Sequence, residues 1–83
     1  MQHFTKQIKT DWGLFTFYFN RIYTVDGIRY HVSFNDKNRK VIIFHMQLQS
    51  GVWKFANSEN FPEWLQKLET QISDIIQQNR TTD

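Results

Sequence analysis

The sequence predicts an α+β fold, in which a four-stranded antiparallel β-meander is followed by one C-terminal amphipathic helix packed on one face (β-β-β-β-α). Residues 14–56 alternate apolar and polar side chains with a period of two, interrupted by turn signals, as half-buried strands do. Residues 61–78 place apolar side chains at intervals of three and four, which is the period of a helix. An apolar stripe this wide must be buried, and the strands supply the second layer. The stripe consists of Phe61, Trp64, Leu65, Leu68, Ile72, Ile75 and Ile76.

Residues 1–13 precede the predicted sheet, and their pattern suits two structures. Phe4, Ile8 and Trp12 are four residues apart, as on one face of a helix, whereas the alternation from Phe4 to Ile8 also suits a strand. We expect a short extended arm, because the two threonines of this segment are weak helix formers. A turn at Asp11-Trp12-Gly13 then leads into the sheet.

The first strand of the meander is expected over residues 14–24, where the three phenylalanines from Phe15 to Phe19 share one face. Asn20-Arg21 interrupts this pattern, and we expect a β-bulge there that redirects the later side chains. Asp26-Gly27 follows as the strongest turn signal in the chain, since a type I′ hairpin needs positive φ at both central residues.

Residues 28–35 show the cleanest alternation in the chain and are predicted to form the second strand. Their apolar side chains are expected to pack under the helix, which directs Arg29 and His31 to the opposite face. A third strand is expected over residues 40–49 and a short fourth strand over residues 52–56. One helix cannot cover both faces of four strands, so the uncovered face is the candidate site. The apolar side chains of the second strand are Ile28, Tyr30, Val32 and Phe34.

Length and composition limit the class of protein. A chain of 83 residues is expected to form a single domain, with residues 79–83 as a frayed tail. It contains no cysteine, which excludes disulfides, thiolate catalysis and cysteine-ligated zinc. It has no run of about 18 apolar residues, and its first ten residues lack the apolar block of a signal peptide. We therefore expect a cytoplasmic protein that is not bound to a membrane.

The residue types that carry catalysis are scattered. His3, His31 and His45 do not have the spacing of metal ligands. The three glycines fall in three separate turns, so no glycine-rich loop that could hold a phosphate is present. We expect His31 and His45 to face each other on adjacent strands. A non-catalytic protein without metal or cofactor is the expectation.

Charge is distributed unevenly along the chain. Residues 1–56 have eight Lys and Arg against three Asp, whereas residues 57–83 have two against five acidic residues, for a net charge of +2. A basic sheet favours an anionic partner. Aromatic rings placed between cations suit single-stranded nucleic acid, because stacking of a base on an aromatic side chain contributes about 1–3 kcal/mol to binding. The alternative is that the charges only solvate the sheet. The candidate nucleic-acid-binding residues are Tyr18, Arg21, Tyr23, Arg29, His31, Lys37, Arg39 and Lys40.

Val41 and Ile43 suggest a second kind of partner. They are predicted to point outward from the third strand, where the helix does not cover them. Contiguous exposed apolar surface usually marks a contact with another protein, and two copies of the chain would cover it with two-fold symmetry. We therefore expect a homodimer with Val41 and Ile43 in the contact. A homo-oligomeric protein-interaction domain without nucleic-acid affinity is the alternative function.

Two short stretches carry a family resemblance within residues 18–76. Trp64, Leu68 and Ile72 match the apolar spacing of a helix, and Arg29-Tyr30-His31-Val32 matches the basic start of a second strand. With the β-β-β-β-α order, these features resemble the Whirly-type single-stranded-DNA-binding domains and the positive-cofactor type of transcriptional coactivator. The resemblance implies a curved sheet that binds single-stranded DNA.

Overall fold

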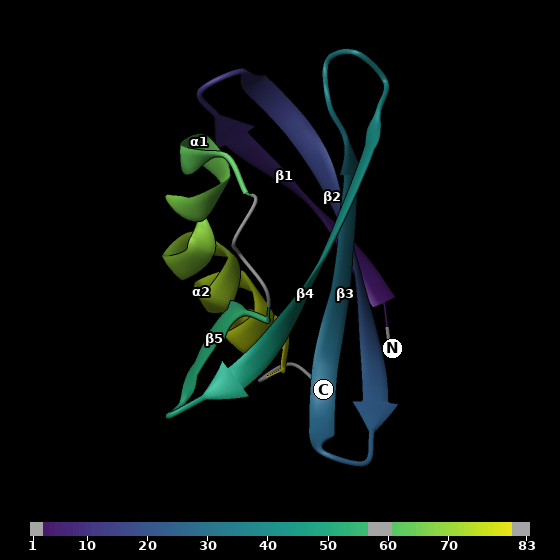
Figure 1. Cartoon of the computed structure of the whole chain (residues 1–83), viewed down its shortest axis with the longest axis vertical. Coiled ribbons are helices and arrows are strands. Elements are labelled where there is room, and N and C mark those ends of the chain that lie inside the picture. Colours follow the sequence, from purple (N-terminus) through teal and green to yellow (C-terminus); the bar gives the residue numbers. More distant parts are fainter. Residues whose placement is uncertain (1–2, 57–60, 81–83) are drawn as a thin grey trace.

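A computed structural model of the chain describes residues 3–56 and 61–80. Five antiparallel strands form one sheet in the order β1-β2-β3-β4-β5, and two helical segments follow (Figure 1). The predicted α+β class and the C-terminal position of the helix are confirmed. The strands are β1 His3–Thr10, β2 Gly13–Thr24, β3 Gly27–Asn35, β4 Val41–Gln49 and β5 Val52–Phe55. The helical segments are α1 Glu63–Gln66 and α2 Glu69–Arg80, joined by a turn at residues 67–68.

The sheet has five strands and not the predicted four, because residues 3–10 form β1 in place of a free arm. β1 pairs with β2 along its whole length. The ring of Phe4 stacks on that of Phe19 with centroids 4.6 Å apart, and Ile8 is fully buried in the core. These apolar contacts decide between arm and strand, since β propensity mainly reflects how well a side chain packs on its neighbours.

The first two hairpins have turns of the same kind. The turn residues are Thr10-Asp11-Trp12-Gly13 in the first hairpin and Thr24-Val25-Asp26-Gly27 in the second. In each turn the threonine Oγ1 accepts a hydrogen bond from the N–H two residues later and donates one to the glycine carbonyl. The glycine then takes a positive φ, 122° at Gly13 and 121° at Gly27. The second turn therefore lies one residue earlier than the predicted Asp26-Gly27, and of its four residues only glycine has a positive φ.

No bulge interrupts β2 at Asn20-Arg21, contrary to the expectation from the sequence. The register of β2 with β3 is continuous there, with Asn20 opposite His31 and Arg21 opposite Tyr30. Alternation therefore continues, and Arg21 stays on the same face as Phe17 and Phe19. The arginine is accommodated because its Nε donates a hydrogen bond of 3.1 Å to the hydroxyl of Tyr30.

Helix α2 packs on one face of the sheet, which we call the helix-side face. Ile72 of α2 is fully buried, as is Leu65 of α1. Aromatic rings fill the space between the two layers: Phe17 stacks on Phe34 with centroids 4.4 Å apart. Each aromatic side chain buries about 150–250 Å², which a domain this small needs to form a sufficient core.

Helix α2 also closes the free edge of β5 through three side chains spaced four residues apart. Four residues rise about 6.0 Å along a helix, and two residues extend about 6.6 Å along a strand, so the two spacings match. The edge of β5 is thereby protected from pairing with another strand. The bonds run from Phe55 N–H to Glu69 Oε2 (3.0 Å), from Trp53 N–H to Ser73 Oγ (2.9 Å) and from Gln77 Nε2 to the Gly51 carbonyl (2.9 Å).

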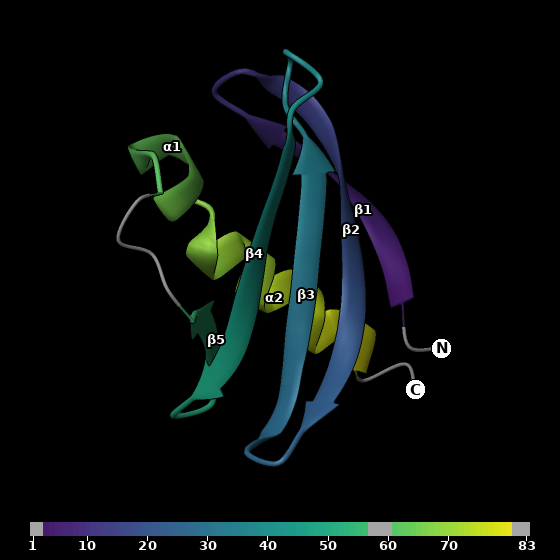
Figure 2. The same cartoon turned by 45° about the vertical axis from the view of Figure 1, so that its right-hand side comes forward.

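The opposite face of the sheet, which we call the outer face, has no described helix over it. Figure 2 looks onto this face, with α2 passing behind β2, β3 and β4. Every second residue of each strand points toward it. The outer face therefore presents side chains of all five described strands together.

Candidate binding face

The strand register arranges the outer-face side chains in rows that cross the sheet. A ligand lying across the strands would meet one such row, and a ligand lying along them would cross several. The central row is His3, Asn20, His31 and His45; the rows on either side of it are Thr5, Tyr18, Ser33 and Ile43, and Ile22, Arg29, Gln47 and Lys54.

None of the five described strands contains an aspartate or a glutamate, although every strand except β4 contains a lysine or an arginine. The carboxylates of the described residues lie in turns and helices instead. On the outer face the cations are Lys9, Arg29 and Lys54, and no carboxylate occupies a neighbouring strand position. This arrangement gives the outer face a positive potential.

Three ring side chains occupy the outer face of the three central strands. The rings of His31 and His45 face each other across β3 and β4, with centroids 4.9 Å apart and planes tilted by 46°. Tyr18 on β2 is opposite Ser33, which makes it the diagonal neighbour of His31, within reach for large side chains. Tyr18 is 46% exposed, so its ring is available to a ligand.

The pKa of His45 is lowered from its ordinary value of 6.5. Burial of part of its ring is the main cause, followed by repulsion from His31 and Arg29. The imidazole of His45 is therefore mostly neutral at pH 7. An approaching phosphate would raise the pKa again, because a nearby negative charge favours the protonated ring. Binding of an anion at this place is thus coupled to uptake of a proton.

The candidate residues of the sequence divide between the two faces. Tyr18, Arg29 and His31 lie on the outer face. Arg21 and Tyr23 lie on the helix-side face, because β2 has no bulge to redirect them. The expectation that Arg21 borders the open face is therefore wrong: its guanidinium carbon is 5.8 Å from the ring centroid of Tyr30.

Lys37, Arg39 and Lys40 lie in the loop between β3 and β4, at one end of the sheet. Asp36 organises this loop, since its Oδ1 accepts hydrogen bonds of 2.9 Å from the N–H groups of both Asn38 and Lys40. The tight turn places Arg39 at a φ of 63°. The three cations therefore belong to this loop and to none of the rows of the outer face.

Val41 and Ile43, the predicted dimer contact, also lie on the outer face and are 57% and 53% exposed. Ile43 belongs to the same row as Tyr18. Among the described residues, β5 pairs only with residues 46–49 of β4, so residues 41–44 pair with β3 alone. An apolar stretch at one border of the sheet therefore adjoins the polar rows.

The candidate residues named from the sequence lack, among other outer-face residues, His45 and Lys54. The two-residue period of β4 already directs His45 outward, opposite His31. Lys54 lies between the buried Trp53 and Phe55, so the same alternation directs it outward. The two-residue alternation of the strands therefore predicts both residues on the outer face.

No protein-family model, curated protein or solved structure matches the chain. The resemblance to Whirly-type and coactivator domains therefore stays a prediction. Within the part of the chain that the structure describes, no helix is long and apolar enough to cross a membrane. The same residues contain no group of three or more His, Asp or Glu side chains placed to hold a metal ion.

Proposed function

We propose that the protein is a non-catalytic module that binds single-stranded nucleic acid across the outer face of its sheet. The observation that supports this most directly is the composition of the described strands, which have cations and rings but no carboxylate. A nucleic-acid backbone carries one negative charge per nucleotide and would be repelled by carboxylates on such a face. The strand positions of the outer face have no carboxylate that would repel the phosphates.

The arrangement of the rows favours a single strand over a duplex. Tyr18, His31 and His45 offer ring faces on which bases can stack, and only an unpaired strand can turn its bases toward the protein. Arg29 and Lys54 lie in the next row and are placed to pair with phosphates. The proposed binding mode therefore combines stacking in the centre with charge pairing beside it.

Titration of labelled single-stranded DNA and RNA at two salt concentrations tests this proposal. Phosphate contacts release counterions, so log K should fall with log salt at a slope of about −0.7 for each contact with a single strand. Duplex DNA of the same length should bind more weakly. A wild-type protein that binds neither single strand in a salt-sensitive way would refute the proposed function.

Self-association through the apolar border of the outer face is the second candidate. It is supported by the exposure of Val41 and Ile43 and by the pairing of residues 41–44 with β3 alone among the described residues. We propose a second copy of the chain as the partner, because a strand edge of this kind is self-complementary in antiparallel pairing. Light scattering should then give about twice the chain mass of 10.1 kDa, and Val41→Lys with Ile43→Lys should restore a folded monomer. A wild-type monomer at high concentration would exclude this candidate.

A further inference from the structure

Trp12 is a large exposed side chain that its turn does not require. The two turns with the sequences Thr10-Asp11-Trp12-Gly13 and Thr24-Val25-Asp26-Gly27 have the same hydrogen bonds and the same positive φ at glycine. The third position is tryptophan in one turn and aspartate in the other, so the turn geometry does not select an indole. Trp12 is nevertheless 53% exposed. A contact outside the turn is therefore the better explanation for it.

Trp12 borders a shallow hollow of about 170 Å³, which we call the Trp12 pocket. Pockets for drug-sized ligands measure about 300–1,000 Å³, so this hollow suits a single ring system. Its aromatic wall includes Phe15 and Trp64, whose ring centroids are 6.4 Å apart. The lining residues are Trp12, Phe15, Asp36, Lys37, Asn38 and Trp64.

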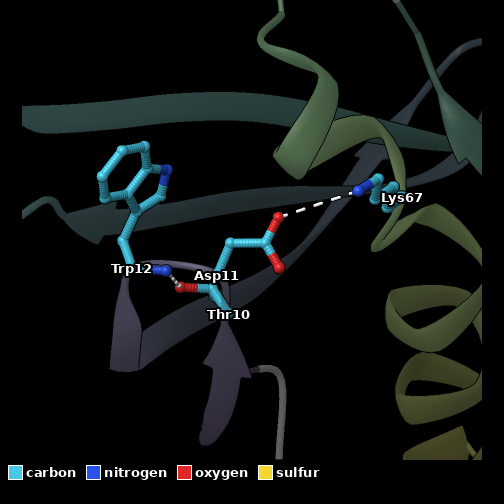
Figure 3. Close-up of polar contacts among 4 residues, drawn as sticks. All are labelled: Thr10, Asp11, Trp12 and Lys67. Atoms are coloured by element: carbon cyan, nitrogen blue, oxygen red, sulfur yellow. Dashed lines mark hydrogen bonds and ion pairs between the residues drawn. The ribbon is translucent and has the colours of Figure 1, made fainter.

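An exposed ion pair joins the turn of Trp12 to the helix layer. The Oδ2 atom of Asp11 is 3.8 Å from Nζ of Lys67, and both side chains are exposed. Figure 3 shows the carboxylate of Asp11 directed toward Lys67, while the indole of Trp12 extends away from this contact. A pair this exposed contributes little to stability, but it shows that the turn lies beside the helix layer with the indole directed away from it.

The charges around the Trp12 pocket favour a ligand with a flat ring and an anionic group. The ammonium of Lys37 is 4.1 Å from the centroid of the Trp12 ring, in a cation–π contact. The carboxylate of Asp36 accepts two backbone N–H groups of its own loop and is already engaged there. A cationic ligand would have to compete with Lys37 for the ring. A ring bearing an anion would replace the ammonium on the indole and gain it as a charge partner.

We propose that the Trp12 pocket binds one nucleotide of the strand that crosses the outer face, with its base on Trp12 and its phosphate on Lys37. This inference rests on the proposed function, because it concerns another nucleotide of the same ligand. Trp12 lies in the turn that precedes β2, six residues before Tyr18, or about 20 Å of extended chain. Because Phe15 and Trp64 pack on the helix-side face, the strand has to pass around this end of the sheet to reach the pocket. A single strand of several nucleotides spans that distance.

Nucleotide binding is tested first with adenosine monophosphate and adenosine as probes. Each is titrated into ¹⁵N-labelled full-length protein while the indole N–H signals of the three tryptophans are followed by NMR. The Trp12 signal, identified by its absence in Trp12→Phe, should shift more with the monophosphate than with the nucleoside. Lys37→Gln should remove that difference. A Trp12 signal that stays in place, or a difference that survives in Lys37→Gln, would overturn the proposal.

Oligonucleotide affinity provides the second test. Trp12→Ala should weaken binding of a single-stranded oligonucleotide by about 5- to 150-fold, the loss expected for one stacked base. Tyr23→Ala is the matched control, since it removes an exposed ring from the helix-side face and should leave the affinity unchanged. If the wild type binds the oligonucleotide and Trp12→Ala binds equally well, the Trp12 pocket is refuted while the outer face stands. If the wild type binds no oligonucleotide, the proposed function itself fails and the pocket proposal fails with it.

Discussion

Replacing Ser73 with alanine tests whether helix α2 holds the edge strand β5. The Ser73 side chain is 4% exposed, and its Oγ accepts the N–H of Trp53, a residue that is 1% exposed, at 2.9 Å. The variant leaves this N–H buried without an acceptor, which costs about 1–3 kcal/mol. Alanine regains up to about 0.7 kcal/mol of helix propensity. The expected net loss is about 0.3–2.3 kcal/mol, out of roughly 4–12 kcal/mol of total stability for a chain of this length.

Urea denaturation followed by far-UV circular dichroism measures this loss. Thr70→Ala is the matched control, because it removes a hydroxyl from an exposed position of the same helix and should be neutral or slightly stabilising. In thermal unfolding, each kcal/mol lowers Tm by roughly 4–8 °C in a domain of this size. A Ser73→Ala variant as stable as the wild type would refute the reasoning that side chains of α2 close the edge of β5.

Three further predictions concern the core and pH. Leu68→Ala should cost about 2–5 kcal/mol of unfolding free energy because Leu68 is buried, whereas the exposed Gln71→Ala should stay within about 0.5 kcal/mol. Equal losses in urea denaturation would contradict the packing of the helix. Because the pKa of His45 is lowered on folding, its contribution to stability is present above its ordinary value of 6.5 and is lost as pH falls below it. His45→Gln should make the decline in stability between pH 7.5 and 5 shallower, and an unchanged decline would contradict this. Over the same interval the affinity of the wild type for single-stranded nucleic acid should rise, and a pH-independent affinity would contradict the coupling of binding to proton uptake.

The central strands and the helix were predictable because the side-chain period alone identifies them. The residues from Ile28 to Phe34 alternate without exception, and all four apolar members lie on the helix-side face. β1 was not predictable in the same way. Its eight residues suit more than one structure, and the choice is made by the stacking of Phe4 on Phe19, fifteen positions later in the chain. Contacts of that range are not visible in a local pattern.

Prediction of the candidate site from the sequence has the same limit, because contacts between distant residues are not visible in a local pattern. Alternation places Arg29 and His31 on the outer face and would also have placed Lys54 there. The predicted bulge at Asn20-Arg21 was wrong, because a charged residue that follows phenylalanines resembles an interruption of the strand. The hydrogen bond of Arg21 to Tyr30 instead lets the arginine remain in register. The Trp12 pocket joins three segments that are distant in the chain, so no spacing in the sequence indicates it.

The central claim, that the outer face binds single-stranded nucleic acid, is tested most directly by two charge-matched double variants. Arg29→Gln with Lys54→Gln removes two cations from the outer face. Lys6→Gln with Arg80→Gln removes two cations elsewhere, since Lys6 lies opposite Phe17 on the helix-side face and Arg80 is the last residue of α2. The measurement is the salt dependence of binding to one single-stranded oligonucleotide.

We predict that the outer-face variant binds more weakly and that its salt slope shrinks by about 1.4 units, or 0.7 for each lost contact, while the control variant keeps the wild-type slope. An equal reduction in both variants would show that binding follows net charge alone. A wild-type slope in the outer-face variant would contradict the proposed binding face.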